Sequence, residues 1–318
     1  MTDFPPDNIP GIEEFKSLTR PSVEALDTIL GAPFGVLDHG FIRVIDYMGD
    51  EAAICQAARV SYGEGTKTVN EDRGLLRYLL RRWHTTPFEM CEIKLHVKLP
   101  VFVARQWIRH RTANVNEYSA RYSILKSEFY LPERQHLAPQ SPLNKQGRDG
   151  SYPDATADRI RRSMAMQHDA AYATYADLIE EDDGGVGLAR ESARAVLPLS
   201  TYTEWYWKID LHNLLHFLRL RADPHAQFEI RAYANVICEL VEAWLPNVWE
   251  AFVDYQLESV TLSRMEVARL RAYIEDLREK IDDEGVGSTA LYLDRGDDLS
   301  SRELTEFGAK AKGLGCDV

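Results

Sequence analysis

The chain contains little cysteine, no long apolar run and too few basic residues to balance its acidic ones. Its 4 cysteines include no C-x-x-C pair and no zinc-like spacing, so they form no recognisable metal-binding motif. No stretch approaches the roughly 20 apolar residues that span a membrane. The N-terminal sequence MTDFPPDNIPGIEEF is acidic and rich in proline, unlike a signal peptide. We therefore expect a cytoplasmic protein without membrane contacts.

The charge balance limits the partners of this protein. Its 50 aspartate and glutamate residues outnumber its 37 lysine and arginine residues, giving a formal net charge of −13. Domains that bind nucleic-acid polymers are generally basic. The acidic balance therefore argues against a nucleic-acid polymer as a partner, but it leaves room for a single nucleotide in a locally basic pocket.

Motifs for phosphate loops and activated thiols are also missing. The segment GEGTK at 63–67 is too short for a phosphate-binding loop, and no G-x-G-x-x-G follows a strand. A dinucleotide would thus bind without a Rossmann fold. No cysteine has an evident base or helix N-terminus nearby to lower its pKa. We expect Cys55, Cys91 and Cys238 in the core and Cys316 in a mobile C-terminus.

The apolar periodicity predicts an α+β fold, with mixed helices around a central, largely antiparallel sheet. The clearest strand runs from Cys91 to Leu99, where apolar and polar residues alternate. Asp210 is in a position to cap the helix that follows it. Strands are further expected at 40–48 and 201–209, and helices at 50–60, 70–83, 101–110, 155–181, 188–197, 211–221, about 224–245 and 259–283.

The C-terminal part is expected to be a helical extension. Within 259–283 the apolar residues follow the 3–4–3–4 spacing of a short coiled-coil seam: Val267, Leu270, Ile274, Leu277 and Ile281. This seam could pack within its own domain or against a partner helix. Ser300 and Glu303 have the spacing of a capping box and predict a last small helix.

Residues 109–122, RHRTANVNEYSARY, form a basic segment in this acidic chain. From Arg105 to Arg121 there are four arginines and one glutamate, which gives a local charge of +3. Arginine forks suit phosphate and carboxylate groups, and asparagine, serine and tyrosine suit the polar edges of a base or sugar. One alternative is a solvated basic loop paired with acidic neighbours. The interleaved Trp107, Tyr118 and Tyr122 favour a partly buried site for a small anion or nucleotide.

Three other clusters contain residues that could bind a ligand or take part in catalysis, but each is ambiguous when taken alone. The segment HTTPFE at 84–89 could be a turn with a capping role. His212 and His216 share a helix face, but no third ligand is evident, so we predict no metal site. Arg221 could stabilise negative charge on a reacting ring, or it could simply pair with Asp223 or a helix C-terminus.

The basic segment resembles the R-H-R-x-x-S-x-N-E-x-S-x-R-Y signature of flavin-dependent thymidylate synthases. Every fixed position matches except Asn114, where the family has serine. Three further segments resemble family elements in the same order: HTTPFE at 84–89, RESARAVLP at 190–198 and RADPHAQ at 221–227. The resemblance suggests an N-terminal extension at 1–37, a flavin-dependent thymidylate synthase domain at 38–257 and a helical C-terminal extension at 258–318.

The resemblance implies a methyltransferase that converts dUMP to dTMP. It would take one carbon from methylenetetrahydrofolate and reducing equivalents from NADPH through bound FAD, without an enzyme nucleophile. The lack of an activated cysteine agrees with this route. The family assembles as a homotetramer with sites shared between subunits. Ser119 is better interpreted as a ligand for phosphate or sugar than as a nucleophile, because no His–Asp pair is in place to activate it.

The resemblance also implies a role for each matching residue. Arg221 would activate the pyrimidine, and Arg121 and Arg194 would meet the phosphate. The residues implied for dUMP are Gln106, Arg109, Glu117, Tyr118, Ser119, Ala120, Arg121, Arg194 and Arg221. The residues implied for FAD are Thr86, Arg109, His110, Arg111, Glu117, Asp210, Leu211, His212 and His216.

Two alternatives remain at the level of the sequence. One is a related enzyme that modifies another pyrimidine nucleotide or delivers a different one-carbon product. The other is a non-catalytic nucleotide-binding protein that acts through its C-terminal helix. The sequence identifies neither the folate nor the NADPH contacts.

Overall fold

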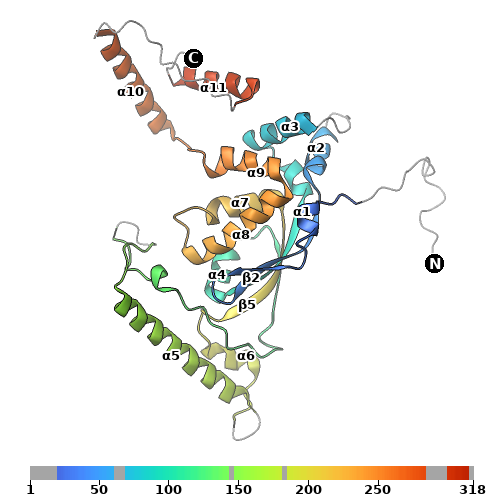
Figure 1. Cartoon of the computed structure of the whole chain (residues 1–318), viewed down its shortest axis with the longest axis vertical. Helices are drawn as coiled ribbons and strands as arrows, with labels where there is room; N and C mark the ends of the chain where they lie inside the picture. Colours follow the sequence, from blue (N-terminus) through green and yellow to red (C-terminus); the bar gives the residue numbers. More distant parts are fainter. Residues whose placement is uncertain (1–19, 61–68, 143–146, 181–184, 284–298, 315–318) are drawn as a thin grey trace, which may run out of the picture. The chain divides into compact units, whose positions relative to one another are not determined.

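A computed structural model describes residues 20–60, 69–142, 147–180, 185–283 and 299–314 of the chain. The chain divides into two compact units, Met1–Glu258 and Ser259–Val318. The larger unit contains the sheet and the candidate site (Figure 1).

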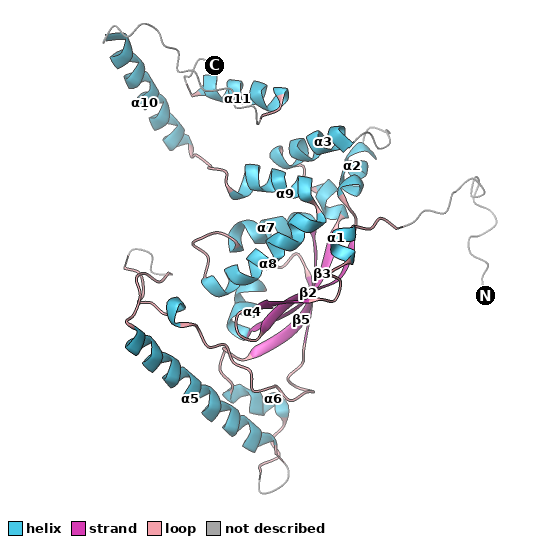
Figure 2. Ribbon diagram, viewed as in Figure 1, coloured by secondary structure: helices cyan, strands magenta, loops and turns pink. Residues whose placement is uncertain are grey.

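The larger unit is built on a five-stranded sheet in which every neighbouring pair is antiparallel. This confirms the predicted α+β class (Figure 2). In sheet order the strands are β1 (Pro33–Val36), β2 (Gly40–Met48), β3 (Glu92–Pro100), β5 (Tyr202–Asp210) and β4 (Asn114–Glu117). The predicted strands correspond to β2, β3 and β5, whereas β1 and β4 were not predicted as strands of their own.

The alternation in β3 produces the two faces that its sequence predicts. Ile93, Leu95 and Val97 are completely buried, whereas Lys94 and His96 on the opposite face are half-buried. β3 pairs along its whole length with β5, from Glu92 opposite Asp210 to Pro100 opposite Tyr202. The buried face supports the helices that carry the candidate site.

Several helices pack around this sheet. Those that bear on the site are α3 (Val69–Arg81), η2 (Thr86–Met90), α4 (Val101–Trp107), α7 (Leu211–Arg221), α8 (Phe228–Trp244), α9 (Pro246–Phe252) and the π-helical turn η5 (Val253–Leu257). The others in this unit are α1 (Glu24–Asp27), α2 (Glu51–Val60), η3 (Arg134–His136), α5 (Asp154–Ile179), α6 (Arg190–Ala193) and η4 (Arg194–Val196). α5 packs against α6, η3 and η4, whereas α7 packs against β5, η2 and α8 (Figure 1).

An aromatic cluster fixes the end of α4. Trp107 is completely buried, and its ring lies 4.7 Å from the Phe217 ring, 5.1 Å from Trp207 and 5.8 Å from Trp205, measured between centroids. Burying side chains of this size is among the larger contributions to a core. The backbone that follows Trp107 is therefore anchored where the basic segment begins.

Several helix predictions were wrong at their ends, and the helix predicted at 259–283 begins only at Arg264. The helix predicted at 101–110 ends at Trp107, and the residues after it lead into the basic segment. The segment predicted as one helix at 188–197 forms α6 followed by the tighter 3₁₀ turn η4. The helix predicted from about residue 224 begins only at Phe228.

The smaller unit contains α10 (Arg264–Asp283) and α11 (Ser301–Gly313). The predicted capping box is present at Ser300 and Glu303. Val267, Leu270, Ile274 and Leu277 are half-buried while the other described side chains of α10 up to Leu277 are exposed. The side chain of Ile281 lies outside the described residues. Since Arg271 Nε donates a hydrogen bond to the Gly313 carbonyl oxygen at 2.5 Å, α10 contacts α11 within the unit.

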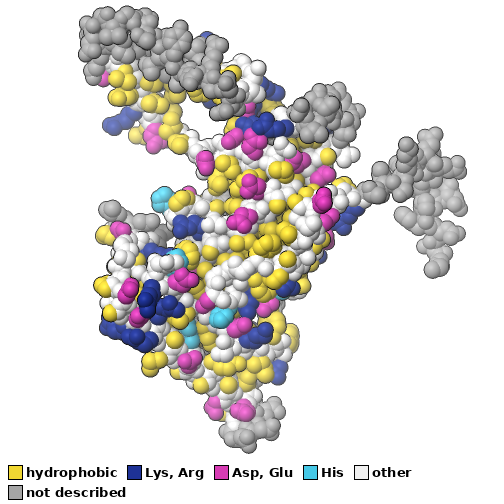
Figure 3. Space-filling view, in the orientation of Figure 1, with side chains coloured by type: hydrophobic (Ala, Val, Ile, Leu, Met, Phe, Trp, Pro, Cys, Tyr) yellow, Lys and Arg dark blue, Asp and Glu magenta, His cyan; other side chains and the backbone are white. Residues whose placement is uncertain are grey.

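Charges of both signs are interspersed with apolar side chains on the face shown in Figure 3. Within the described residues, each helix is too short or too polar to cross a membrane. The predicted domain boundaries at 37 and 257 remain predictions, and β1 lies on the N-terminal side of the first of them.

Candidate functional site

Helix α7 begins directly at the end of β5, and Asp210 caps it as predicted. The Asp210 carboxylate accepts hydrogen bonds from the Asn213 backbone N–H at 2.9 Å and from the Asn213 side-chain amide at 2.7 Å. Leu214, Leu215 and Leu218 are buried on one side of the helix. The opposite side therefore presents its polar residues to the space around the helix.

An open cleft of about 550 Å³ lies where this polar side meets the basic segment. Its lining residues are Arg109, His110, Arg111, Thr112, Ile209, Asn213, His216, Leu220 and Arg221, none of which is acidic. Within the described part of the chain, neither Arg109 nor Arg111 has a hydrogen-bond or ion-pair partner. Three guanidinium groups without a carboxylate among them have the charge and geometry that suit an anion.

Arg221 and His110 form the central pair of the cleft. Arg221 Nε donates a hydrogen bond to His110 Nε2 at 3.1 Å. Burial, followed by the positive charges of Arg221 and His216, lowers the pKa of His110 to about 4. The imidazole is therefore neutral at physiological pH, and its Nε2 lone pair is available to accept from Arg221. Burial and the charge of Arg109 also lower the pKa of Arg221, although a guanidinium stays protonated near neutral pH.

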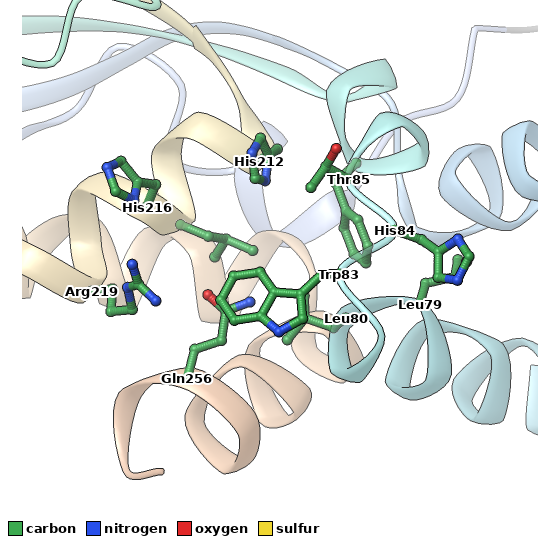
Figure 4. A pocket seen from close by; sticks show the side chains of 11 residues that line it. Leu79, Leu80, Trp83, His84, Thr85, His212, His216, Arg219 and Gln256 are labelled. Carbon is green, nitrogen blue, oxygen red and sulfur yellow. The ribbon is translucent and has the colours of Figure 1, made fainter. Parts of the chain in front are cut away.

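A second, smaller hollow adjoins the cleft along α7 (Figure 4). It is lined by Leu79, Leu80, Trp83, His84, Thr85, Phe88, His212, Leu215, His216, Arg219 and Gln256. His216 lines both spaces. The fold thus brings the HTTPFE element, the basic segment and α7 together, although they are separated by long stretches of sequence.

The second half of the basic segment is held by the sheet. Within β4, Glu117 lies opposite Trp205 of β5, and its Oε1 accepts a hydrogen bond from Thr203 Oγ1 at 2.8 Å. The Tyr118 backbone N–H donates to the Glu204 carbonyl oxygen at 2.8 Å. This pairing extends Glu117 and Tyr118 along the edge of the sheet.

Two arginines predicted for the phosphate meet at Glu191 of α6 and do not line the cleft. Arg121 contacts the Glu191 carboxylate, at 3.1 Å from Nε and 3.0 Å from the terminal nitrogen. Arg194 Nε donates to the Glu191 carbonyl oxygen at 3.2 Å. The Arg121–Glu191 pair is about half exposed, so its own contribution to stability is small.

The structure brings part of the predicted set together. Arg109, His110, Arg111, His216 and Arg221 line the cleft, and His212 joins His216 at the hollow. Outside these two linings, Thr86 begins η2, Gln106 is half-buried on α4, and Ser119 and Ala120 are half-buried after β4. The Leu211 side chain is fully buried, and its N–H donates to the Cys91 carbonyl oxygen at 2.8 Å.

Sequence reasoning missed several lining residues. Asn213 and Leu220 line the cleft, and Trp83, Arg219 and Gln256 line the hollow. The helical spacing from His212 and His216 could have indicated Asn213 and Arg219, because residues three or four apart share a face. Gln256 gave no such signal, since it lies on the π-helical turn η5.

The described cysteines have no features of a nucleophile. Cys55 and Cys91 are completely buried, as predicted, and Cys238 is half-buried against the core. Burial raises the pKa of each thiol to about 12, so all three stay protonated near neutral pH. Cys316 lies outside the described residues. The described residues also contain no group of three His, Cys, Asp or Glu side chains arranged to hold a metal ion.

Comparison with known proteins gives concordant matches. A family model described as thymidylate synthase complementing protein matches residues 43–247. A protein of Rickettsia conorii named flavin-dependent thymidylate synthase is 60% identical over 253 residues, covering 77% of this chain and 86% of that protein. A protein of the same name from Gluconobacter oxydans is 58% identical over 295 residues, covering 93% of this chain and 92% of its own length.

Solved structures of a UMP/dUMP methylase, PolB from Streptomyces cacaoi, share this fold. The complex with 5-Br UMP superposes with a TM-score of 0.62 at 30% sequence identity, covering 70% of this chain and 98% of that one. The complex with 5-Br dUMP gives a TM-score of 0.63 at 31% identity, covering 70% and 99%.

Proposed function

The chain belongs to the flavin-dependent thymidylate synthase family, and on this premise we propose that it methylates dUMP to dTMP. In the overall reaction, methylenetetrahydrofolate gives its one-carbon unit to C5 of the pyrimidine, replacing hydrogen. Two electrons from NADPH reduce that carbon to a methyl group, and tetrahydrofolate is released.

The cleft without acidic residues is the structural observation that supports this proposal. Both dUMP and FAD carry phosphate, and Arg109 and Arg111 have no partner among the described residues. Arg109 and Arg111 are exposed, so water hydrates their guanidinium groups, and a phosphate can replace that water without first breaking an ion pair. The residues present therefore fit a nucleotide phosphate.

The donor set also fits FAD. Arg109, His110 and Arg111 offer charged and polar groups at the cleft, and His212 and His216 continue the polar surface to the hollow. Asp210 would contribute by capping α7 and setting its position. Bound FAD would supply the two-electron transfer that links NADPH to the one-carbon unit.

Within this proposal, Arg221 stabilises the negative charge that develops on the pyrimidine. Its Nε is tied to His110, and within the described chain its terminal amino groups have no other partner. A guanidinium fixed before the substrate arrives needs little reorganisation when charge develops. The neutral His110 thereby acts as a positioning residue for Arg221.

The proposal includes assembly as a cytoplasmic homotetramer. Two observations support shared sites. Arg121 and Arg194 are held at Glu191, and they do not line the cleft that contains Arg221. If the active site needs Arg221 together with Arg121 and Arg194, then Arg121 and Arg194 can come from another subunit of a symmetric assembly.

The first experiment is an absorbance spectrum of the purified protein after incubation with FAD, followed by anaerobic addition of NADPH with and without dUMP. The proposal requires flavin bands that NADPH bleaches, and dTMP once methylenetetrahydrofolate is added. A protein that binds no FAD would refute the flavin-dependent route.

Arg221→Ala is expected to lower dTMP formation about 10²–10³-fold, the usual cost of losing one group that stabilises developing charge. The variant should keep its flavin, which absorbance would show. Arg162→Ala, which removes an exposed arginine from α5, serves as the matched control and should leave turnover unchanged. If Arg221→Ala loses flavin and stability together, Arg221 has a structural role instead.

The similarity to PolB keeps a second substrate open. That protein is described as a UMP/dUMP methylase. Side-by-side turnover of dUMP, UMP and dCMP at equal concentrations tests this alternative. A kcat/KM for UMP equal to or above that for dUMP would change the substrate assignment while keeping the reaction.

A further inference from the structure

Helix α3 ends in a Schellman motif with a tryptophan at an unusual position. The His84 N–H donates to the Leu79 carbonyl oxygen at 2.9 Å, and the Trp83 N–H donates to the Leu80 carbonyl oxygen at 3.2 Å. In a motif with these two hydrogen bonds the residue in the left-handed conformation is Trp83, whose φ is +61°. Glycine is the usual residue there, because a side chain at positive φ crowds the following carbonyl. Trp83 is thus held in a conformation that a large side chain disfavours.

The Trp83 indole is also unusually exposed. It retains 59% of its accessible surface. In Figure 4 it extends into the hollow toward Arg219 and Gln256, whereas the His84 ring points away from them. The His84 ring instead packs near Tyr78, with 5.6 Å between ring centroids. A strained backbone that holds an exposed aromatic ring over a hollow suggests a role in binding.

Two polar groups accompany the indole. The Arg219 guanidinium carbon lies 5.7 Å from the Trp83 ring centroid, within the range of a cation–π contact. Within the described residues, neither Arg219 nor Gln256 has a hydrogen-bond or ion-pair partner. Gln256 reaches the hollow from η5, a π-helical turn of the kind often found at functional sites.

These three groups suit one kind of ligand. An exposed indole face stacks on a planar aromatic ring, the amide pairs with the polar edge of that ring, and the guanidinium pairs with an anion attached to it. The hollow encloses only about 30 Å³, so it cannot take in a whole ring. The ring would lie against the exposed indole face, with its polar edge toward the hollow.

We propose that Trp83, Arg219 and Gln256 form a recognition wall for a planar heteroaromatic ring that bears an anionic group. The inference rests on the proposed function, because FAD, NADPH and methylenetetrahydrofolate all have this chemistry. The wall binds one of them beside the cleft. Trp83 then acts as a binding residue despite its unfavourable backbone conformation.

The test measures direct binding to the full-length protein. FAD is titrated first, and NADPH and tetrahydrofolate are titrated separately onto the FAD-loaded protein. The variants are Trp83→Gly, which restores the preferred residue at the helix end, Trp83→Phe, which keeps an aromatic ring, and Arg219→Ala. Arg162→Ala is the matched charge control, and Tm is recorded for each.

Trp83→Gly should raise the Kd of one ligand about tenfold or more, in line with the loss of one stacked ring. Its Tm should stay equal to or above that of the wild type, because glycine suits the conformation. The Kd of the same ligand for Trp83→Phe should stay within about threefold of the wild-type value, and Arg219→Ala should raise that Kd. The ligand whose Kd rises in these variants is the one whose ring the wall binds.

Two outcomes would overturn the proposal of a recognition wall. In the first, all three Kd values in Trp83→Gly and Arg219→Ala stay within about twofold of wild type. In the second, Trp83→Gly lowers Tm and raises the Kd of all three ligands by the same factor, which would show that Trp83 has a structural role. Failure of the proposed function is distinguishable, because it would show in the wild type as a lack of FAD binding or dTMP formation.

Discussion

At the scale of single residues, His110 illustrates how surroundings determine a protonation state. Its imidazole is partly buried and lies among Arg221 and His216, with ring centroids 5.8 Å apart between the two histidines. Both burial and positive neighbours disfavour the imidazolium, so the pKa falls to about 4. The neutral ring can then accept a hydrogen bond from Arg221, which the charged ring could not.

This shift predicts a pH dependence of stability. The folded-state pKa of about 4 lies below the ordinary value of 6.5, so the unfolded chain takes up this proton first as pH falls. The stabilisation from the neutral imidazole is complete above pH 6.5 and is lost as pH falls toward 4. For a half-buried group we expect a loss of about 1–2 kcal/mol over this window.

Urea unfolding at several pH values checks this expectation against His110→Gln, which keeps an acceptor but does not titrate. The free energy of unfolding of the wild type should fall more steeply between pH 6.5 and 4 than that of the variant. Parallel curves would show that His110 titrates normally in the folded protein.

At the scale of elements, α7 organises both the cleft and the hollow. It starts at a capped N-terminus beside β5, buries its leucines and presents His212, His216 and Arg219 on other faces. The cap is set by Asp210, the last residue of β5. A change at this junction should therefore affect the ligand site as well as the stability of the helix.

Asp210→Ala removes the acceptor for the Asn213 N–H and should cost about 1 kcal/mol of stability, the usual value for a lost N-cap. We also expect weaker FAD binding, because the first turn of α7 positions His212. Chemical denaturation and flavin titration measure the two effects. Asp210→Asn, which can still cap, is the control and should remain close to wild type in stability. An alanine variant as stable as wild type would show that the cap contributes nothing.

At the scale of the whole molecule, the arginines form two separate groups. Arg109, Arg111 and Arg221 line the cleft, whereas Arg121 and Arg194 meet at Glu191. The proposed homotetramer resolves this separation if each site takes one group from each of two subunits.

Co-expression of two differently tagged variants tests this arrangement. Arg221→Ala and Arg194→Ala should each be inactive alone. In mixed oligomers with shared sites, about a quarter of the sites would contain both intact arginines, so about a quarter of wild-type turnover should return. Size-exclusion chromatography with light scattering confirms the mixed assembly. Mixed oligomers without any recovered activity would place both arginines in a site within one chain.

The sequence by itself determined the main strands, the helix at 211–221 with its Asp210 cap, and the capping box at Ser300. It also determined the family, through the motif at 109–122. These features are local: periodicity, capping and motifs depend on residues a few positions apart, so they can be read along the chain.

Only the tertiary structure decided how these pieces meet. Helix α4 ends at Trp107, three residues before the predicted end, and the ring of Trp107 is completely buried among aromatic side chains from β5 and α7. The pairing of β4 with β5, the contact between Arg221 and His110, and the convergence of Trp83, Arg219 and Gln256 all join residues far apart in sequence. Such contacts depend on the path of the whole chain, which no short window of sequence contains.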